Sequence, residues 1–274
     1  MKNQDRILLG HGSGGKLSHM LLSDLFLKYF QNAELGKLND AARIECPGES
    51  LVFSTDSYVV DPIFFPGGDI GKLAVCGTVN DVAMMGGRPL YLSVGFIIEE
   101  GLLLSDLETI LGSMRAAAEE ARVQIVTGDT KVVPNGTADK IFINTAGVGI
   151  PLAGTNLAGQ NAQVGDKIIV NGSVADHGVT VMARREGLKL DLDLKTDSAP
   201  LNHMIEEILE KTPDIHVMRD PTRGGIATTL NEIAWQSDVG IKLTEKDIPV
   251  SPQVNAVCEI LGLDPLYIAN EGKV

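Results

Sequence analysis

The stretch that decides the fold is FSTDSYVVDPIFFPGGDIGKLAVCGTVNDVAMMGG, residues 53–87. Its first part belongs to an alternating, β-branched segment at residues 50–60, which predicts a strand. Its second part, residues 69–87, predicts a helix with Asp69 as its N-cap and Gly86 as its stop signal. A strand followed by a helix is the first unit of a domain built from a sheet and packed helices.

The segments around this stretch continue the alternation. The pattern predicts strands at residues 89–98, 123–129 and 140–149, and helices at residues 17–30 and 105–122. The last of these helices opens with a capping box, Ser105-x-x-Glu108. From residue 50 onward the order is β-α-β-α-β-β, so we expect an α+β domain over residues 1–150.

A second domain is expected at residues 166–274, after the aperiodic Gly- and Asn-rich segment 151–166. Helices are expected near 174–186, 199–211, 224–236 and 252–262, and strands near 167–172, 215–219, 239–243 and 265–269. The chain stops inside a strand-like pattern, from which we expect that a C-terminal piece is missing.

The composition excludes several classes of function. The chain carries 23 Lys and Arg against 36 Asp and Glu, a net charge of −13 with no basic run to offset it, so nucleic acid and acidic membranes are not expected partners. The three cysteines are far apart and form neither a disulfide framework nor a zinc motif. The N-terminus lacks the apolar core of a signal peptide, which predicts a reducing, cytoplasmic location.

The segment GHGSGGKL, residues 10–17, matches two phosphate-binding patterns in letters only. A P-loop needs Ser or Thr after the lysine, and Leu17 follows Lys16 here. A dinucleotide-binding turn needs a preceding buried strand and a later strand that ends in an acid, and neither is predicted. Two interpretations stay open: an N-terminal arm without a ligand, or a glycine-rich arm that closes over phosphates bound elsewhere, with Lys16 as a point charge.

Four aspartates stand in unusual settings. Asp81 lies within the apolar stripe of the helix at 69–86, with Asn80 beside it, and a carboxylate there is costly unless it is paired or binds metal. Asp56 is in the middle of a strand, Asp129 ends one, and Asp220 precedes a Thr-Arg-Gly-Gly helix start that suits phosphate. Each has an ordinary alternative: a solvent-facing acid, an edge strand, a turn or an N-cap.

The aspartates make a site of hard oxygen ligands without paired histidines or thiolates. Such ligands select Mg²⁺, and Mg²⁺ held by carboxylates usually also holds a polyphosphate. A bound metal would supply the positive charge that the acidic chain lacks. The sequence therefore predicts a magnesium–polyphosphate site.

The ordered motifs resemble a known family. HGSGGK, the stretch at 53–87, VTGDTKVV, FINTAGVG, DHG, RDPTRGG and ANEGK occur in this order in HypE-type hydrogenase maturation factors. These factors are related to aminoimidazole-ribonucleotide synthase and selenophosphate synthetase. The resemblance covers residues 8–274. It implies an N-terminal α+β domain that dimerises through its sheet, a C-terminal α/β domain, and ATP bound with Mg²⁺ in the cleft.

The resemblance also implies an activity. HypE-type enzymes use ATP to dehydrate a carbamoyl group on a C-terminal cysteine to a thiocyanate, which supplies the cyanide ligands of [NiFe]-hydrogenase. By resemblance, the metal–nucleotide carboxylates are Asp56, Asp81, Asp129 and Asp220. Residues Lys16, Gly14, Gly15, Asn80 and Arg223 are expected to contact the nucleotide. Lys131 and Glu271 are expected beside the thiocarboxamide, with Glu271 as the base.

The chain departs from the family at its end. HypE-type chains finish in a Pro-Arg-x-Cys tail, and nothing follows Val274 here, so we expect a form without the acceptor thiol that cannot complete the reaction. The partners implied are a second copy, a HypF-type carbamoyltransferase and a HypC–HypD-type iron scaffold. Alternatives are a nucleotide-sensing scaffold for these partners or another ATP-using enzyme of the superfamily. Selenophosphate synthesis needs a reactive Cys or selenocysteine in the arm, which the arm here lacks.

Overall fold

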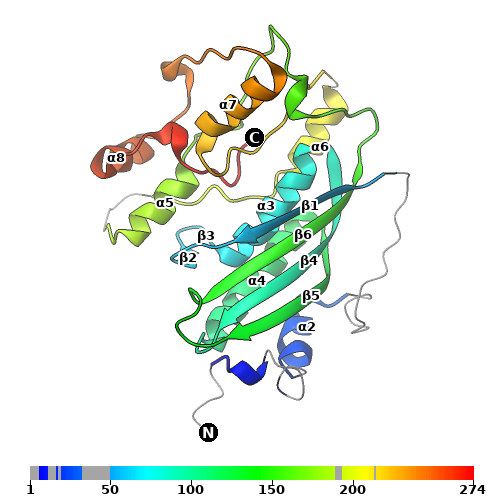
Figure 1. The fold of residues 1–274 in the computed structure, drawn as a ribbon, viewed down its shortest axis with the longest axis vertical. Helices are drawn as coiled ribbons and strands as arrows, with labels where there is room; N and C mark the ends of the chain where they lie inside the picture. Colours follow the sequence, from blue (N-terminus) through cyan, green and yellow to red (C-terminus); the bar gives the residue numbers. More distant parts are fainter. Residues whose placement is uncertain (1–5, 12–16, 18–19, 33–49, 189–192, 213) are drawn as a thin grey trace.

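A computed structural model of the chain describes residues 6–11, 17, 20–32, 50–188, 193–212 and 214–274. It confirms the predicted β-α-β-α-β-β order of the N-terminal domain (Figure 1). The elements are β1 (Val52–Tyr58), the short β2 (Phe64–Phe65) and β3 (Gly68–Asp69), α3 (Ile70–Met84), β4 (Gly87–Glu99), α4 (Leu104–Ala121), β5 (Gln124–Val133) and β6 (Ile141–Pro151). Before them lie a 3-10 turn η1 (Leu9–His11), the π-helical η2 (Leu21–Phe26) and α2 (Leu27–Phe30).

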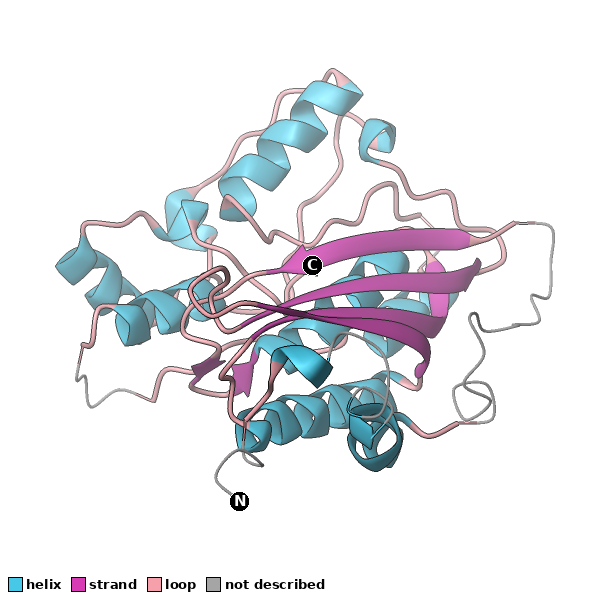
Figure 2. Ribbon diagram, turned by 60° about the horizontal axis from the view of Figure 1, so that its bottom comes forward, coloured by secondary structure: helices cyan, strands magenta, loops and turns pink. Residues whose placement is uncertain are grey.

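The sheet has the strand order β1-β6-β4-β5. β4 runs parallel to β5, and β6 pairs antiparallel with both β1 and β4. Alternate residues of β4, among them Leu92, Val94 and Phe96, are buried against α3 and α4, which lie below the strands in the view of Figure 2. The opposite face, turned toward the reader in Figure 1, leaves Phe53 at 65% and Ile97 at 45% exposed.

Helix α3 is held tightly at its start. The Asp69 carboxylate accepts hydrogen bonds from Gly71 N at 2.7 Å and Lys72 N at 3.0 Å, which confirms the predicted N-cap, and Ser113 Oγ of α4 donates to the same oxygen at 2.5 Å. The helix ends at Met84, just before the predicted stop. Burial raises the pKa of Asp69, although all three donors favour its charged form.

Glycines let α3 approach its neighbours closely. A Cβ on Gly71 would lie 2.6 Å from the Ile110 carbonyl oxygen of α4, and a Cβ on Gly77 would collide with the Tyr58 ring of β1. A larger residue at either position would push α3 away from α4 or from the sheet. The position of α3, and of the polar residues near its C-terminal end, therefore depends on these contacts.

The C-terminal part confirms the four predicted helices: α5 (Asp176–Arg185), α6 (Asn202–Lys211), α7 (Gly225–Ser237) and α8 (Pro252–Leu261). Three short 3-10 turns accompany them: η4 (Gly159–Asn161), η5 (Glu245–Asp247) and η6 (Pro265–Tyr267). A small core joins α5, α8 and the segment after η6 through Val179, Val254, Val257 and Ile268. No helix in the described part of the chain is both long and apolar enough to cross a membrane.

The prediction of four strands in the C-terminal part is wrong, because the structure forms no strand at the predicted positions, all of which it describes. In its described residues, the segments at 167–172, 215–219 and 239–243 run as irregular chain, and 265–267 is a 3-10 turn. A strand needs a hydrogen-bonded neighbour, which an alternating pattern alone does not provide. Ile168 and Ile169, which made the first of these segments look like a strand, are 53% and 84% exposed.

The C-terminal part docks on α3 through α6 and the segment before it. Leu201 and Ile205 pack against Ala83 and Met84 at the end of α3. Asn202 donates to the Ala121 carbonyl at 3.0 Å. The segment at 196–201 is thereby laid along α3, and the last residues of the chain lie against it (Figure 1).

The α3–α4 contact yields a first prediction. Gly71→Ala should lower the free energy of unfolding by about 1–3 kcal/mol, because a methyl group must displace the Ile110 carbonyl or the whole helix. Gly112→Ala is the matched control on α4: its Cβ would meet only Tyr29 at an ordinary 3.7 Å, so it should raise stability by about 0.5–1 kcal/mol. Urea unfolding of both variants measures this, and a change of the same sign in the two would contradict it.

Candidate active site

Asp81 lies on α3 where that helix faces β1. Its carboxylate accepts a hydrogen bond from Ser54 Oγ at 2.7 Å. Burial raises the pKa of Asp81, repulsion from Asp56 adds to the increase, and the hydrogen bond from Ser54 and the charges of two arginines oppose it. The prediction that this carboxylate lies in a partly apolar setting with a polar partner is therefore confirmed.

Two further aspartates face Asp81. Asp56 is paired across the sheet with the buried Thr145, so its side chain is on the helix-covered face. Asp220, in the segment before α7, has its pKa raised to about 6 by burial and then by repulsion from Asp81 and Asp56. Arg223 Nη2 lies 4.0 Å from Asp56 Oδ1. Three of the four predicted metal ligands, together with Arg223, are therefore gathered at one place.

This group of aspartates fits a divalent cation in chemistry but is not closed around one. Within the described ranges, no three His, Cys, Asp or Glu side chains stand close enough to hold a metal ion together. The carboxylates are hard oxygen donors of the kind that Mg²⁺ prefers. Their mutual repulsion, expressed in the raised pKa values of Asp81 and Asp220, is what a cation would relieve.

Glu271 approaches the same group from the C-terminal end. Glu271 as a whole is partly exposed, but its carboxyl group is surrounded by protein atoms. Burial raises the pKa of this carboxyl well above the ordinary value. Repulsion from Asp220 and Asp197 adds to this increase, followed by that from Asp56 and Asp81. A carboxyl whose pKa is raised by burial and by neighbouring carboxylates is a candidate for proton transfer.

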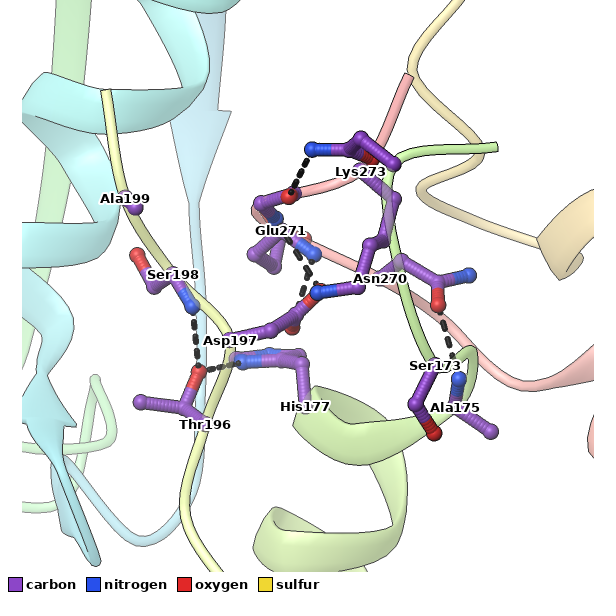
Figure 3. Close-up of polar contacts among 12 residues, drawn as sticks. Ser173, Ala175, His177, Thr196, Asp197, Ser198, Ala199, Asn270, Glu271 and Lys273 are labelled. Atoms are coloured by element: carbon purple, nitrogen blue, oxygen red, sulfur yellow. Dashed lines mark hydrogen bonds and ion pairs between the residues drawn. The ribbon is translucent and has the colours of Figure 1, made fainter. Parts of the chain in front are cut away.

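Three segments meet around Glu271 (Figure 3). Asp197 accepts hydrogen bonds from the backbone N–H groups of Glu271 and Gly272, both at 3.2 Å, and pairs with Lys273 Nζ at 2.9 Å. Asn270 ties the same segment to α5, because its Oδ1 accepts from Ala175 N at 2.7 Å. Sequence reasoning missed Asp197, because an aspartate in the polar loop LKTDSAP carries no distinguishing pattern.

His177, at the start of α5, belongs to this junction as a neutral side chain. Burial lowers its pKa to about 4. Its Nδ1 lies 2.7 Å from Thr196 Oγ1, and the Phe65 ring meets it edge-on at 5.5 Å between centroids. A neutral imidazole held between an aromatic ring and a hydroxyl fixes the 196–199 segment against α5.

Asn80 was expected to contact the nucleotide, and the structure gives its side chain another use. Its Nδ2 donates to the carbonyls of Ala199 at 3.1 Å and Glu271 at 3.4 Å, and its Oδ1 accepts from Leu201 N at 2.8 Å. Both amide hydrogens are therefore committed to protein contacts, and the residue is buried. Asn80 joins α3 to the two segments that form the wall of the site.

Asp129 and Lys131 are not brought to Glu271 within one chain. Both lie on β5, at the edge of the sheet opposite β1, and alternation from the buried Val132 places them on the open face. In the register of the sheet, Asp129 on β5 lies level with Ser57 on β1, the neighbour of Asp56. Three strand spacings of about 4.8 Å each separate the two positions, a distance of roughly 14 Å. Within one chain, the structure therefore does not bring Asp129 and Lys131 to the other three aspartates.

The predicted residues of the glycine-rich arm, Gly14, Gly15 and Lys16, lie outside the described residues, as does Cys46. The other two cysteines, Cys76 and Cys258, are free and buried, and burial raises the pKa of Cys76 to about 12. A thiol that stays protonated inside the core is a poor nucleophile. Neither of these two cysteines is suited to accept a carbamoyl group.

The fold and the site together define the class. Residues 38–151 match the family model "AIR synthase related protein, N-terminal domain", and residues 163–274 match the model of the C-terminal domain of the same proteins. The chain is therefore a two-domain AIR-synthase-related protein.

Its relatives define the family within that class. The carbamoyl dehydratase HypE of Cupriavidus necator is 53% identical over 98% of this chain and 77% of its own length. A crystal structure of the hydrogenase maturation protein HypE in complex with ATP superposes with a TM-score of 0.95 at 58% identity, over 97% of this chain and 79% of the other. A chain from a HypE–HypF complex superposes with a TM-score of 0.80 at 49% identity, over 92% and 82%. The chain belongs to the HypE family of carbamoyl dehydratases.

The aspartates yield a prediction about stability and pH. The pKa of Asp220 in the folded chain is about 6, above the ordinary aspartate value of 3.8, so its ionisation opposes folding. The penalty is absent below about pH 4, grows as the pH rises to about 6, and is complete above that range. In metal-free protein, Asp220→Asn should therefore raise the Tm clearly at about pH 7.5 and little at about pH 4.5.

Thermal unfolding in EDTA checks this, with Asp139→Asn, an exposed carboxylate outside the group, as the control that should not respond. An equal gain for Asp220→Asn at both pH values would mean that it comes from packing and not from the removal of a buried charge.

Proposed function

We propose that the chain is the ATP-dependent dehydratase of [NiFe]-hydrogenase maturation. It converts a protein-bound S-carboxamide to a thiocyanate, from which the cyanide ligands of the active-site iron derive. Membership of the HypE family supports this activity. The observation that carries it in the structure is the position of Glu271 beside the aspartates of α3, β1 and the segment before α7.

Mg²⁺ would be held by Asp56, Asp81 and Asp220. These three carboxylates repel one another in the free chain. A divalent cation would be attracted by their negative charges and would relieve the repulsion between them. When bound, Mg²⁺ supplies the positive charge that neutralises the phosphates of ATP. Because the chain has a net charge of −13, a bound cation would favour the approach of a polyphosphate.

The phosphates of ATP would face Arg223 and the first turn of α7. Arg223 is exposed and directly precedes Gly224 and Gly225, where α7 begins, and the positive end of a helix dipole favours an anion. An ATP complex is known for a relative that is 58% identical, which supports ATP as the nucleotide. We propose that Gly14, Gly15 and Lys16 belong to an arm that closes over the phosphates.

Glu271 would remove the proton. Phosphoryl transfer from ATP to the amide oxygen of R–S–C(=O)NH₂ makes that oxygen a leaving group, and ADP and one proton are released. Glu271 takes the remaining N–H proton as the C–O bond breaks, phosphate departs, and R–S–C≡N remains. Burial and the neighbouring carboxylates raise the pKa of Glu271, and the positive charge of a bound cation would lower that pKa and favour the base form.

We further propose a homodimer through the open face of the sheet. A second copy would bury Phe53 and Ile97, which are exposed on that face. It would also give Asp129 and Lys131 a site to act on, because one chain holds them at the far edge of its own sheet. On this arrangement the β5 residues of one copy serve the Glu271 of the other.

The wider assignments follow from the family. A HypE–HypF complex is known for a relative that is 49% identical, so we propose a HypF-type carbamoyltransferase as a partner and a HypC–HypD-type scaffold as the acceptor of cyanide. The two free cysteines fit the reducing cytoplasm. We assign nucleotide binding and dimerisation to residues 1–150 and the Glu271 segment to a domain at residues 166–274. Family models over 38–151 and 163–274 support this division.

Calorimetry tests the metal–nucleotide site. Asp81→Asn should weaken ATP binding at least about tenfold in Mg²⁺, because it removes one charged ligand of the cation. Asp139→Asn, an exposed aspartate far from α3 in the sequence, should bind as the parent does. Equal losses in the two variants would refute the metal site. Binding without dehydration of a carbamoylated C-terminal cysteine would favour the nucleotide-sensing scaffold instead.

Sedimentation tests the dimer. Ile97→Glu places a charge at the centre of the open face, on β4, and should shift the protein from dimer to monomer at micromolar concentration because the charge would have to be desolvated. Trp235→Ser removes an equally prominent apolar side chain, 82% exposed on α7, and should leave the dimer intact. A parent protein that sediments as a monomer would rule out this assembly.

A further inference from the structure

One carboxylate holds the backbone on which Glu271 is carried. Asp197 Oδ1 accepts from Glu271 N and Oδ2 from Gly272 N, both at 3.2 Å, while Lys273 Nζ lies 2.9 Å from Oδ2. The Asp197 side chain is 5% exposed and that of Lys273 is 11% exposed. Three successive residues thus direct their donors at a single buried acid (Figure 3).

The fit between the two segments leaves no room for adjustment. A Cβ at position 272 would collide with the backbone carbonyl of Asp197, so only glycine allows the chain to pass so close. The N–H groups of residues 271 and 272 therefore reach the carboxylate directly and not through water. A longer acid at position 197, such as glutamate, could not keep both hydrogen bonds with this backbone.

The other side of Glu271 is held by α3. Asn80 Nδ2 donates to the Glu271 carbonyl at 3.4 Å and to the Ala199 carbonyl at 3.1 Å, and Asn80 directly precedes Asp81. The peptide groups before and after the Glu271 side chain are thus fixed, one by Asp197 and one by Asn80. The distance between Glu271 and the aspartates of the metal site depends on these two contacts.

We propose that Asp197 is a positioning residue for the dehydration: it does not touch the substrate, but it fixes the backbone at residues 271–272 so that the Glu271 carboxylate meets the substrate nitrogen. This inference rests on the proposed role of Glu271 as the base. A small displacement of a catalytic group is enough to slow a reaction by about 100-fold. The contribution of Asp197 should therefore appear in the rate of dehydration and not in the affinity for ATP.

The experiment compares three variants of a form of the protein that carries a carbamoylated C-terminal cysteine. Asp197→Asn removes the charge and one acceptor. Asp197→Glu keeps the charge for Lys273 but moves the carboxylate by one methylene. Asp193→Asn is the matched control, because this neighbouring aspartate is exposed and pairs with the exposed Lys195. ATP affinity, single-turnover dehydration by mass loss of one water, and hydrogen exchange at residues 271–272 are measured on each.

We expect Asp197→Asn to bind ATP like the parent, to dehydrate about 100-fold more slowly, and to exchange the amide hydrogens of residues 271 and 272 faster. Asp197→Glu should fold and bind ATP but dehydrate at least about tenfold more slowly, and Asp193→Asn should match the parent in all three measurements. Should Asp197→Asn not fold, Asp197→Glu decides the question.

Dehydration by Asp197→Glu at the parental rate would overturn the proposal, since it would reduce Asp197 to an ion-pair partner of Lys273. A parallel loss of ATP affinity and rate would overturn it too, because it would indicate a general collapse of the site. If the parent itself binds ATP and does not dehydrate, the proposed function fails, whereas unchanged exchange at residues 271–272 in Asp197→Asn would refute the positioning role alone.

Discussion

The structure depends on the burial of α3 between the sheet, α4 and the C-terminal segments, which leaves Lys72 and Asp81 as its two partly exposed residues. A helix buried on all sides must satisfy every polar group that it carries. Thr78 does so through Thr145 Oγ1 at 2.5 Å and Tyr58 Oη at 3.2 Å, which fix the helix on the sheet. Asn80 does so through the segments at 199–201 and 271, which fix the C-terminal part on the helix. The site forms where these two sets of contacts meet.

The same burial explains why the site is electrostatically unfavourable in the free chain. Asp81 and Asp220 have raised pKa values because they are desolvated and repel each other and Asp56, and Glu271 adds a fourth acid to the group. The hydrogen bond from Ser54 and the charges of Arg219 and Arg223 oppose the increase at Asp81, and Arg223 is largely exposed. A protein that keeps such a group gives up stability for function. The stability it gives up is returned when a cation and a nucleotide bind.

The sequence predicted what depends on local chemistry. The Asp69 cap, the order of strands and helices in the N-terminal domain and the setting of Asp81 follow from short-range patterns, and the structure confirms them. The expected C-terminal strands failed, because pairing depends on distant neighbours that periodicity does not reveal. Asn80 and Asp197 could not be assigned for the same reason: their partners lie far along the chain, and only the fold brings them to Glu271. The sequence also could not show that Asp129 faces away from the other aspartates.

The central claim is that Asp56, Asp81 and Asp220 hold the metal of a nucleotide complex beside Glu271. The most direct test is the anomalous diffraction of Mn²⁺ in crystals grown with Mn²⁺ and a non-hydrolysable ATP analogue. We expect anomalous peaks within about 2–2.5 Å of carboxylate oxygens of these aspartates, with the γ-phosphate on the side of Glu271. Peaks bound to other residues, or a nucleotide whose γ-phosphate lies away from Glu271, would contradict it.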